Sequence, residues 1–142
     1  MFSPDGNWVA YSSTERGITT IYVQPFPATG TRYQLFAKGS DNSHHPHWSP
    51  DGKELFYDPR ITAFESVSVT TQPAFAFGNA VALPRRFQGA PVTSRTPYDI
   101  TPDGRFLGLI TAGQMEFVRG SVDQIQVVLN WQEELKQRVP AR

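Results

Sequence analysis

A four-residue turn that occurs three times constrains the fold of this chain more than any other feature. Each copy starts with a serine or threonine, continues Pro-Asp-Gly, and follows an apolar residue. The three prolines fall at positions 4, 50 and 102, so the copies are spaced 46 and 52 residues apart. Three similar turns at such a spacing indicate an internal repeat of one small structural unit.

The residue types in these turns have a clear structural role. Proline presets the first central position of a type I turn, aspartate suits the second, and glycine accepts the left-handed conformation that follows. This combination closes a tight hairpin with a bulge. We therefore expect a structural role, and no catalytic one, for Pro4, Asp5, Gly6, Pro50, Asp51, Gly52, Pro102, Asp103 and Gly104.

Short strand-like segments fill the sequence between the turns. They cover residues 8–12, 19–24, 32–36, 54–57, 65–70, 81–87, 106–111 and 125–131. Many short strands with frequent turn signals predict an all-β fold, and four strands per repeat of this length is typical of a propeller blade. The sequence thus predicts a partial β-propeller of about three four-stranded blades, at residues 1–40, 41–90 and 91–131.

The end of the chain has a helical pattern. Asn130 and Glu133 stand at the spacing of a capping box. Trp131, Leu135 and Val139 follow one another every four residues and form a single apolar stripe. We expect a short C-terminal helix over residues 131–139.

Composition excludes several classes of function. The 142 residues hold 13 basic and 13 acidic side chains, whereas a nucleic-acid binder needs a basic excess. Arg85, Arg86 and Arg95 form a small basic cluster that we expect to be solvated. Cysteine is absent, which removes disulfides and thiolate metal sites. No window of 18 apolar residues exists, so the sequence predicts no membrane span.

Motifs of known catalytic machinery are also missing. The chain has no kinase signature, no Gly-x-Ser-x-Gly nucleophile motif and no phosphate-binding loop. The sequence therefore predicts a module that is not an enzyme and that needs no cofactor.

The three histidines, His44, His45 and His47, lie within four positions. Alternation along a strand predicts that His45 and His47 share one face and that His44 points away from them. No third ligand follows at a fitting spacing, so we expect no metal site.

Alignment of the repeats suggests a partner for one of these histidines. It matches His47 with Asp99 and Pro46 with Tyr98, so neighbouring units would bring His47 and Asp99 together. Polar residues at the mouth of a central channel are candidates for ligand contact. The candidate ligand-binding residues are His45, His47, Tyr98 and Asp99.

The Ser-Pro-Asp-Gly hairpin and the aromatic-rich strand after it resemble the repeat of TolB-like, WD-repeat-like β-propellers. Residues 8–13, 21–27 and 127–131 are similar to the C-terminal propeller of bacterial membrane-linked serine/threonine protein kinases. The resemblance runs from residue 2 to about residue 135. Such propellers have six or more blades, so the resemblance implies a C-terminal fragment whose missing blades come from a parent chain or an oligomer partner.

The resemblance implies a non-catalytic module that binds or senses a protein or small ligand, as the distal part of a signalling protein. It also implies a location outside the cytoplasm, such as the periplasm. Two alternatives stay open. One is the accessory propeller of a prolyl-oligopeptidase-like serine peptidase without its catalytic domain, and the other is a periplasmic TolB-like protein-binding propeller.

Overall fold

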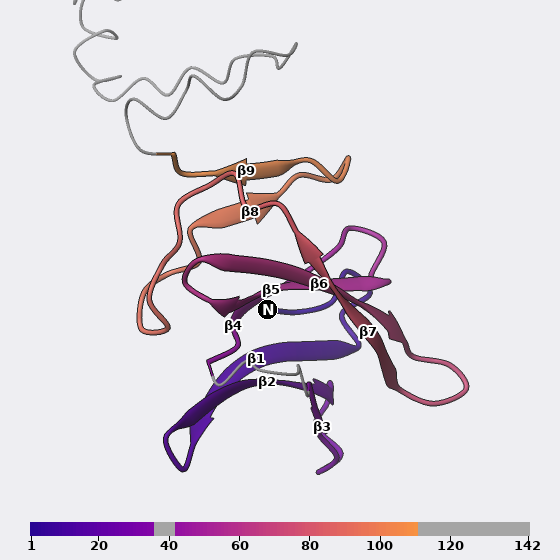
Figure 1. The fold of residues 1–142 in the computed structure, drawn as a ribbon. Coiled ribbons are helices and arrows are strands. Elements are labelled where there is room, and N and C mark those ends of the chain that lie inside the picture. The colour runs from indigo at the N-terminus through magenta and orange to yellow at the C-terminus, as the bar shows by residue number, and fades with distance from the viewer. Residues whose placement is uncertain (36–41, 111–142) are drawn as a thin grey trace, which may run out of the picture. The chain divides into compact units, whose positions relative to one another are not determined.

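The computed structural model describes residues 1–35 and 42–110, which form three antiparallel β-sheets (Figure 1). The first sheet consists of β1 (Trp8–Glu15), β2 (Ile18–Pro25) and β3 (Tyr33–Gln34). The second sheet consists of β4 (His44–Trp48), β5 (Glu54–Arg60), β6 (Ala63–Thr70) and β7 (Ala76–Leu83). The third sheet consists of β8 (Tyr98–Ile100) and β9 (Phe106–Gly108).

The prediction of an all-β fold is confirmed. The sheets in the described ranges have three, four and two strands in sequential order, and none of them closes on itself. The helix expected over residues 131–139 and the strand expected over 125–131 lie outside the described residues. No helix in the described part of the chain is long and apolar enough to cross a membrane.

The fourth strand of the second sheet begins earlier than the sequence predicts. The expected span was 81–87, but β7 covers Ala76–Leu83 and pairs with β6 from Phe64 to Thr70. Proline cannot donate to a sheet ladder, and β7 accordingly ends just before Pro84. Residues 84–97 then form a long connection to β8 without strands of its own, which we call the 84–97 loop.

The three repeated turns have the same local geometry, and each leads directly into a strand. One precedes β1, one joins β4 to β5, and one joins β8 to β9. In the second turn, the amide of Gly52 donates to the carbonyl of Ser49 at 2.9 Å, and Gly52 has φ of 70°. The Ser49 hydroxyl donates to Asp51 and accepts from the amide of Glu54. Ser3 and Thr101 make the matching contacts in the other turns.

Replacing the first residue of a turn should weaken the protein measurably. In Ser49→Ala the Glu54 amide and the Asp51 carboxylate both lose their hydroxyl partner, so we expect a loss of about 1 kcal/mol in the free energy of unfolding. Urea denaturation measures it. Ser12, exposed on β1, is the matched control, and Ser12→Ala should have little effect. Equal losses in the two variants would show that the turn hydroxyl has no special role.

Two apolar clusters join the sheets. The strand β5 contributes to both, because its side chains alternate between its two faces. Leu55 and Tyr57 belong to a cluster with residues of the first sheet, whereas Phe56 belongs to a cluster with Tyr98 of the third. The second sheet therefore lies between the other two, as Figure 1 shows.

Candidate functional site

A β-bulge in β4 determines where the histidines point. His44 pairs with Asp58 and His47 pairs with Phe56. A step of three residues along β4 therefore corresponds to a step of two residues along β5, which defines a bulge. The extra residue is taken up at His45, which has φ of 53° in the left-handed region. A β-bulge changes the direction in which side chains leave the strand. Residues with a strained backbone are concentrated at functional sites. The prediction that His44 points away from His45 is therefore wrong, since the two rings are neighbours with centroids 4.5 Å apart.

The centre of this region is a buried ion pair between Asp58 and Arg85. Asp58 is fully buried on β5, and Arg85 reaches it from the 84–97 loop with N–O distances of 2.6 and 3.3 Å. The guanidinium also donates to the carbonyls of Ala63, Phe87 and Gln88. The expectation that Arg85 is solvated is wrong, because its side chain is 8% exposed.

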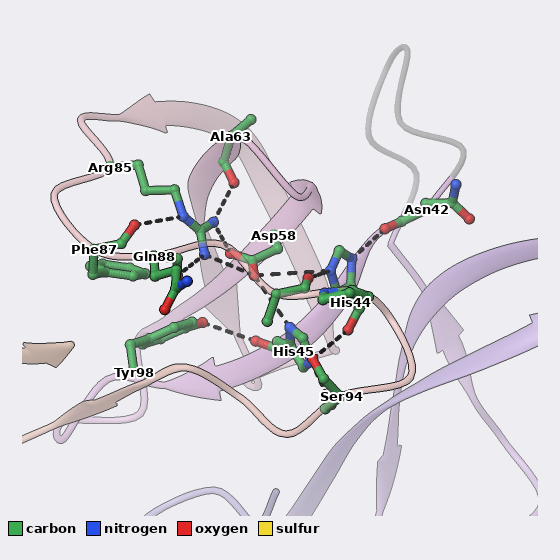
Figure 2. Close-up of polar contacts among 12 residues, drawn as sticks. Asn42, His44, His45, Asp58, Ala63, Arg85, Phe87, Gln88, Ser94 and Tyr98 are labelled. Carbon is green, nitrogen blue, oxygen red and sulfur yellow. Dashed lines mark hydrogen bonds and ion pairs between the residues drawn. The ribbon is translucent and has the colours of Figure 1, made fainter. Parts of the chain in front are cut away.

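Two histidines reach the same carboxylate from the opposite side, as Figure 2 shows. His45 Nδ1 lies 3.3 Å from Asp58 Oδ2, and its Nε2 lies 2.9 Å from the carbonyl oxygen of Ser94. His44 Nε2 is 4.0 Å from Asp58 Oδ2 and 3.0 Å from the Ala90 carbonyl oxygen. His44 Nδ1 faces the carbonyl oxygen of Asn42 at 2.5 Å. We call His44, His45, Asp58, Arg85 and Tyr98 the Asp58 cluster.

The cluster also includes the first residue of β8. The hydroxyl of Tyr98 donates to the carbonyl of His45 at 2.9 Å. Burial, together with the nearby negative charge of Asp58, raises the pKa of Tyr98, so the hydroxyl stays a donor. The cluster therefore links β4, β5, the 84–97 loop and β8.

Hydrogen bonds explain the Asp58 cluster better than a metal ion does. His44, His45 and Asp58 offer three ligand atoms within 4.8 Å of one another. A zinc ion lies about 2 Å from each ligand. These groups already have hydrogen-bond partners, because the Ala90 carbonyl oxygen lies 3.0 Å from His44 Nε2 and both carboxylate oxygens of Asp58 face Arg85.

The third histidine pairs with a carboxylate of a neighbouring sheet. His47 Nε2 lies 2.9 Å from Asp99 Oδ1, which joins β4 to β8. His47 Nδ1 lies 3.1 Å from the carbonyl oxygen of Trp48. The pKa of Asp99 is lowered by the amide of Ile100, which donates to it, and by His47. Asp99 is therefore an anion at neutral pH, and most of its side chain is exposed.

An apolar pocket opens beside this pair. Its volume is about 310 Å³. It lies where residues of all three repeated turns meet, and its lining consists of Met1, Phe2, Pro4, His47, Trp48, Ser49, Pro50, Ile100 and Pro102. The indole Nε1 of Trp48 is buried without a hydrogen-bond partner among the described residues.

The four candidate ligand-binding residues separate into two groups. His47 and Asp99 lie together beside the pocket, whereas His45 and Tyr98 are buried in the Asp58 cluster. A ligand contact of any of the four stays a prediction. Sequence reasoning missed Asp58 and Arg85, which are 27 positions apart. The only signal for Asp58 was a carboxylate that follows the apolar run of β5.

Comparisons with known proteins find a likeness among solved structures and none among family models or curated proteins. The chain is similar to the crystal structure of a putative 6-phosphogluconolactonase from Bacteroides uniformis ATCC 8492, with 21% sequence identity and a TM-score of 0.47. The match covers 76% of this chain and 31% of that one, so the chain spans about a third of the matched protein's length.

This comparison contradicts the predicted family. The matched structure is named as a lactonase, not as a TolB-like, WD-repeat-like or kinase-associated propeller, so that resemblance is corrected. The predictions of a non-catalytic binding or sensing module and of a chain that is not an enzyme are withdrawn with that family, because the matched structure is named as an enzyme. At this identity and TM-score, the likeness transfers neither activity nor substrate to the present chain.

Proposed function

We propose that the described residues carry an acid–base centre, formed by His47 and Asp99, that acts on a small molecule in the adjoining pocket. The observation that carries this proposal is the 2.9 Å contact between His47 Nε2 and Asp99 Oδ1 at the edge of an apolar pocket. Carboxylate–imidazole pairs orient the ring and stabilise its protonated form. The apolar lining fits a substrate with a hydrocarbon body.

The surroundings of His47 favour the role of proton donor. Both ring nitrogens face oxygen acceptors, namely Asp99 and the Trp48 carbonyl, and the two N–H groups of an imidazolium satisfy both contacts. A proton donor helps most where an alkoxide departs, as in the opening of an ester or lactone. Water adds to the carbonyl carbon, the ring C–O bond breaks, and the Nε2 proton of His47 passes from its contact with the exposed Asp99 carboxylate to the departing oxygen. The proton released by the water restores the imidazolium.

Removing the negative charge of Asp99 tests this role. We expect Asp99→Asn to lower kcat/KM for the hydrolysis of δ-valerolactone by on the order of 10²-fold, the range of general acid–base catalysis. Acid release at constant pH measures the rate. Asp103→Asn is the matched control, because Asp103 is also an exposed carboxylate of the third sheet's hairpin but faces Arg105 and no histidine. A wild-type rate equal to that of buffer, or equal rates in the two variants, contradicts the proposal.

The same proposal includes the arrangement of the sheets. We place them as successive blades of a partial β-propeller, at residues 1–40, 41–90 and 91–131. The repeated turn, which has the same geometry each time and leads directly into a strand of each sheet, supports this arrangement. Further sheets would then come from a longer parent chain or from a second copy of this one.

A further inference from the structure

We infer that the Asp58 cluster is a proton-dependent clamp, which fastens the 84–97 loop and β8 to β4 and β5 while His45 is protonated. The 84–97 loop contains 14 residues and no strand. Loops of that length need contacts of their own to stay ordered. Here His44 and His45 supply two of them, through the carbonyls of Ala90 and Ser94.

The donors and acceptors around the His45 ring show why the clamp requires a protonated imidazole. A carbonyl or carboxylate oxygen only accepts, whereas a neutral imidazole has one donor and one acceptor nitrogen. The ring of His45 faces two such oxygens, one from the Asp58 carboxylate and one from the Ser94 carbonyl. Only an imidazolium donates to both. Loss of the proton leaves a ring lone pair opposed to an oxygen, and a buried polar contact of that kind is costly.

Every charged group around His45 fits this account. Asp58 on β5 attracts the protonated ring, and Arg85 in the 84–97 loop repels it but is itself held by Asp58. His44 lies beside it on β4, and Tyr98 on β8 stays neutral. Burial is the largest single influence and lowers the pKa of His45. The hydrogen bonds with Asp58 and Ser94 together outweigh it, so the pKa of His45 is raised.

The direction of the pH effect follows from that raised pKa. The clamp contributes its full stability below the pKa of an unfolded histidine, near 6.5, and loses it as the pH rises through the folded pKa of His45. The clamp is therefore closed below the ordinary pKa of histidine and opens as the pH rises through the higher folded pKa of His45. Because β8 follows the loop directly, the clamp also holds Asp99 opposite His47.

Hydrogen exchange of the full chain tests the clamp without reference to catalysis. Two loop amides report on it: Gln88, which donates to Leu109, and Ser94, which donates to Pro91. After correction for the intrinsic pH dependence of exchange, we expect their protection to fall several-fold between pH 6 and pH 8.5. The amides of Leu55 and Val67, in the middle of the second sheet, should keep theirs.

Two further measurements make the result decisive. An NMR titration of the wild-type histidine rings should give His45 a midpoint above that of an unfolded histidine. In His45→Gln, which carries no titrating ring, loop protection should no longer depend on pH. Loop protection that is constant across this range in the wild type, or a His45 midpoint at or below the ordinary value, overturns the clamp. The wild-type titration decides even if the variant does not fold.

Discussion

Arg85→Met should lower the free energy of unfolding by about 3–5 kcal/mol, the largest effect that we expect from a single substitution. Methionine fills much of the space of the arginine side chain but leaves the carboxylate of Asp58, which is fully buried, without its ion-pair partner. Three loop and strand carbonyls lose their donor as well. Urea denaturation followed by tryptophan fluorescence measures the loss.

Arg86→Met is the matched control for this variant. Arg86 adjoins Arg85 in the sequence, and its side chain is exposed. Its replacement should change stability by less than about 0.5 kcal/mol, as is usual for surface positions. A loss in Arg85→Met no larger than that in Arg86→Met would mean that Asp58 is stable without the guanidinium, and would refute the account of the cluster.

Leu55→Ala should cost about 2–5 kcal/mol through the loss of buried apolar area and the cavity left behind. Leu55 is fully buried in the cluster that joins the first and second sheets. The substitution should lower the midpoint of the unfolding transition for both sheets together. Amide exchange at Val23 and at Val67 reports on them separately.

Leu107→Ala is the comparison for this core position, because Leu107 is partly exposed on β9. It should cost clearly less than Leu55→Ala. If Leu55→Ala destabilised the second sheet and left Val23 protected as in the wild type, the two sheets would not share a core.

The repeated turns could be predicted from the sequence because their chemistry is local. Ser49, Asp51 and Gly52 are a few positions apart, and each has one conformational role that its residue type dictates. The all-β fold follows from the same kind of signal, since alternation along a strand such as β5 is written in consecutive residues. The contact between His47 and Asp99 became visible only because the repeat aligns their positions.

The Asp58 cluster could not be predicted because it depends on long-range geometry. A bulge at His45 turns two consecutive side chains toward one carboxylate, and strand alternation gives the opposite expectation. Arg85 looked like part of a surface basic cluster, yet β7 ends early enough for the 84–97 loop to fold back over β5. The bulge leaves no mark in residue type or spacing, and Pro84 marks the end of β7 but not the course of the loop that follows it.

A double-mutant cycle of Asp58→Ala and Arg85→Ala tests the central claim, that a buried ion pair organises this site, most directly. The cycle isolates the coupling between two side chains from the cost of each truncation. We predict a coupling of about 2–3 kcal/mol, within the range measured for residues of one network. The pair Glu15–Arg32, whose side chains are nearly half exposed, should show much weaker coupling under the same conditions. Additive losses for Asp58 and Arg85, with no coupling between them, would contradict the account.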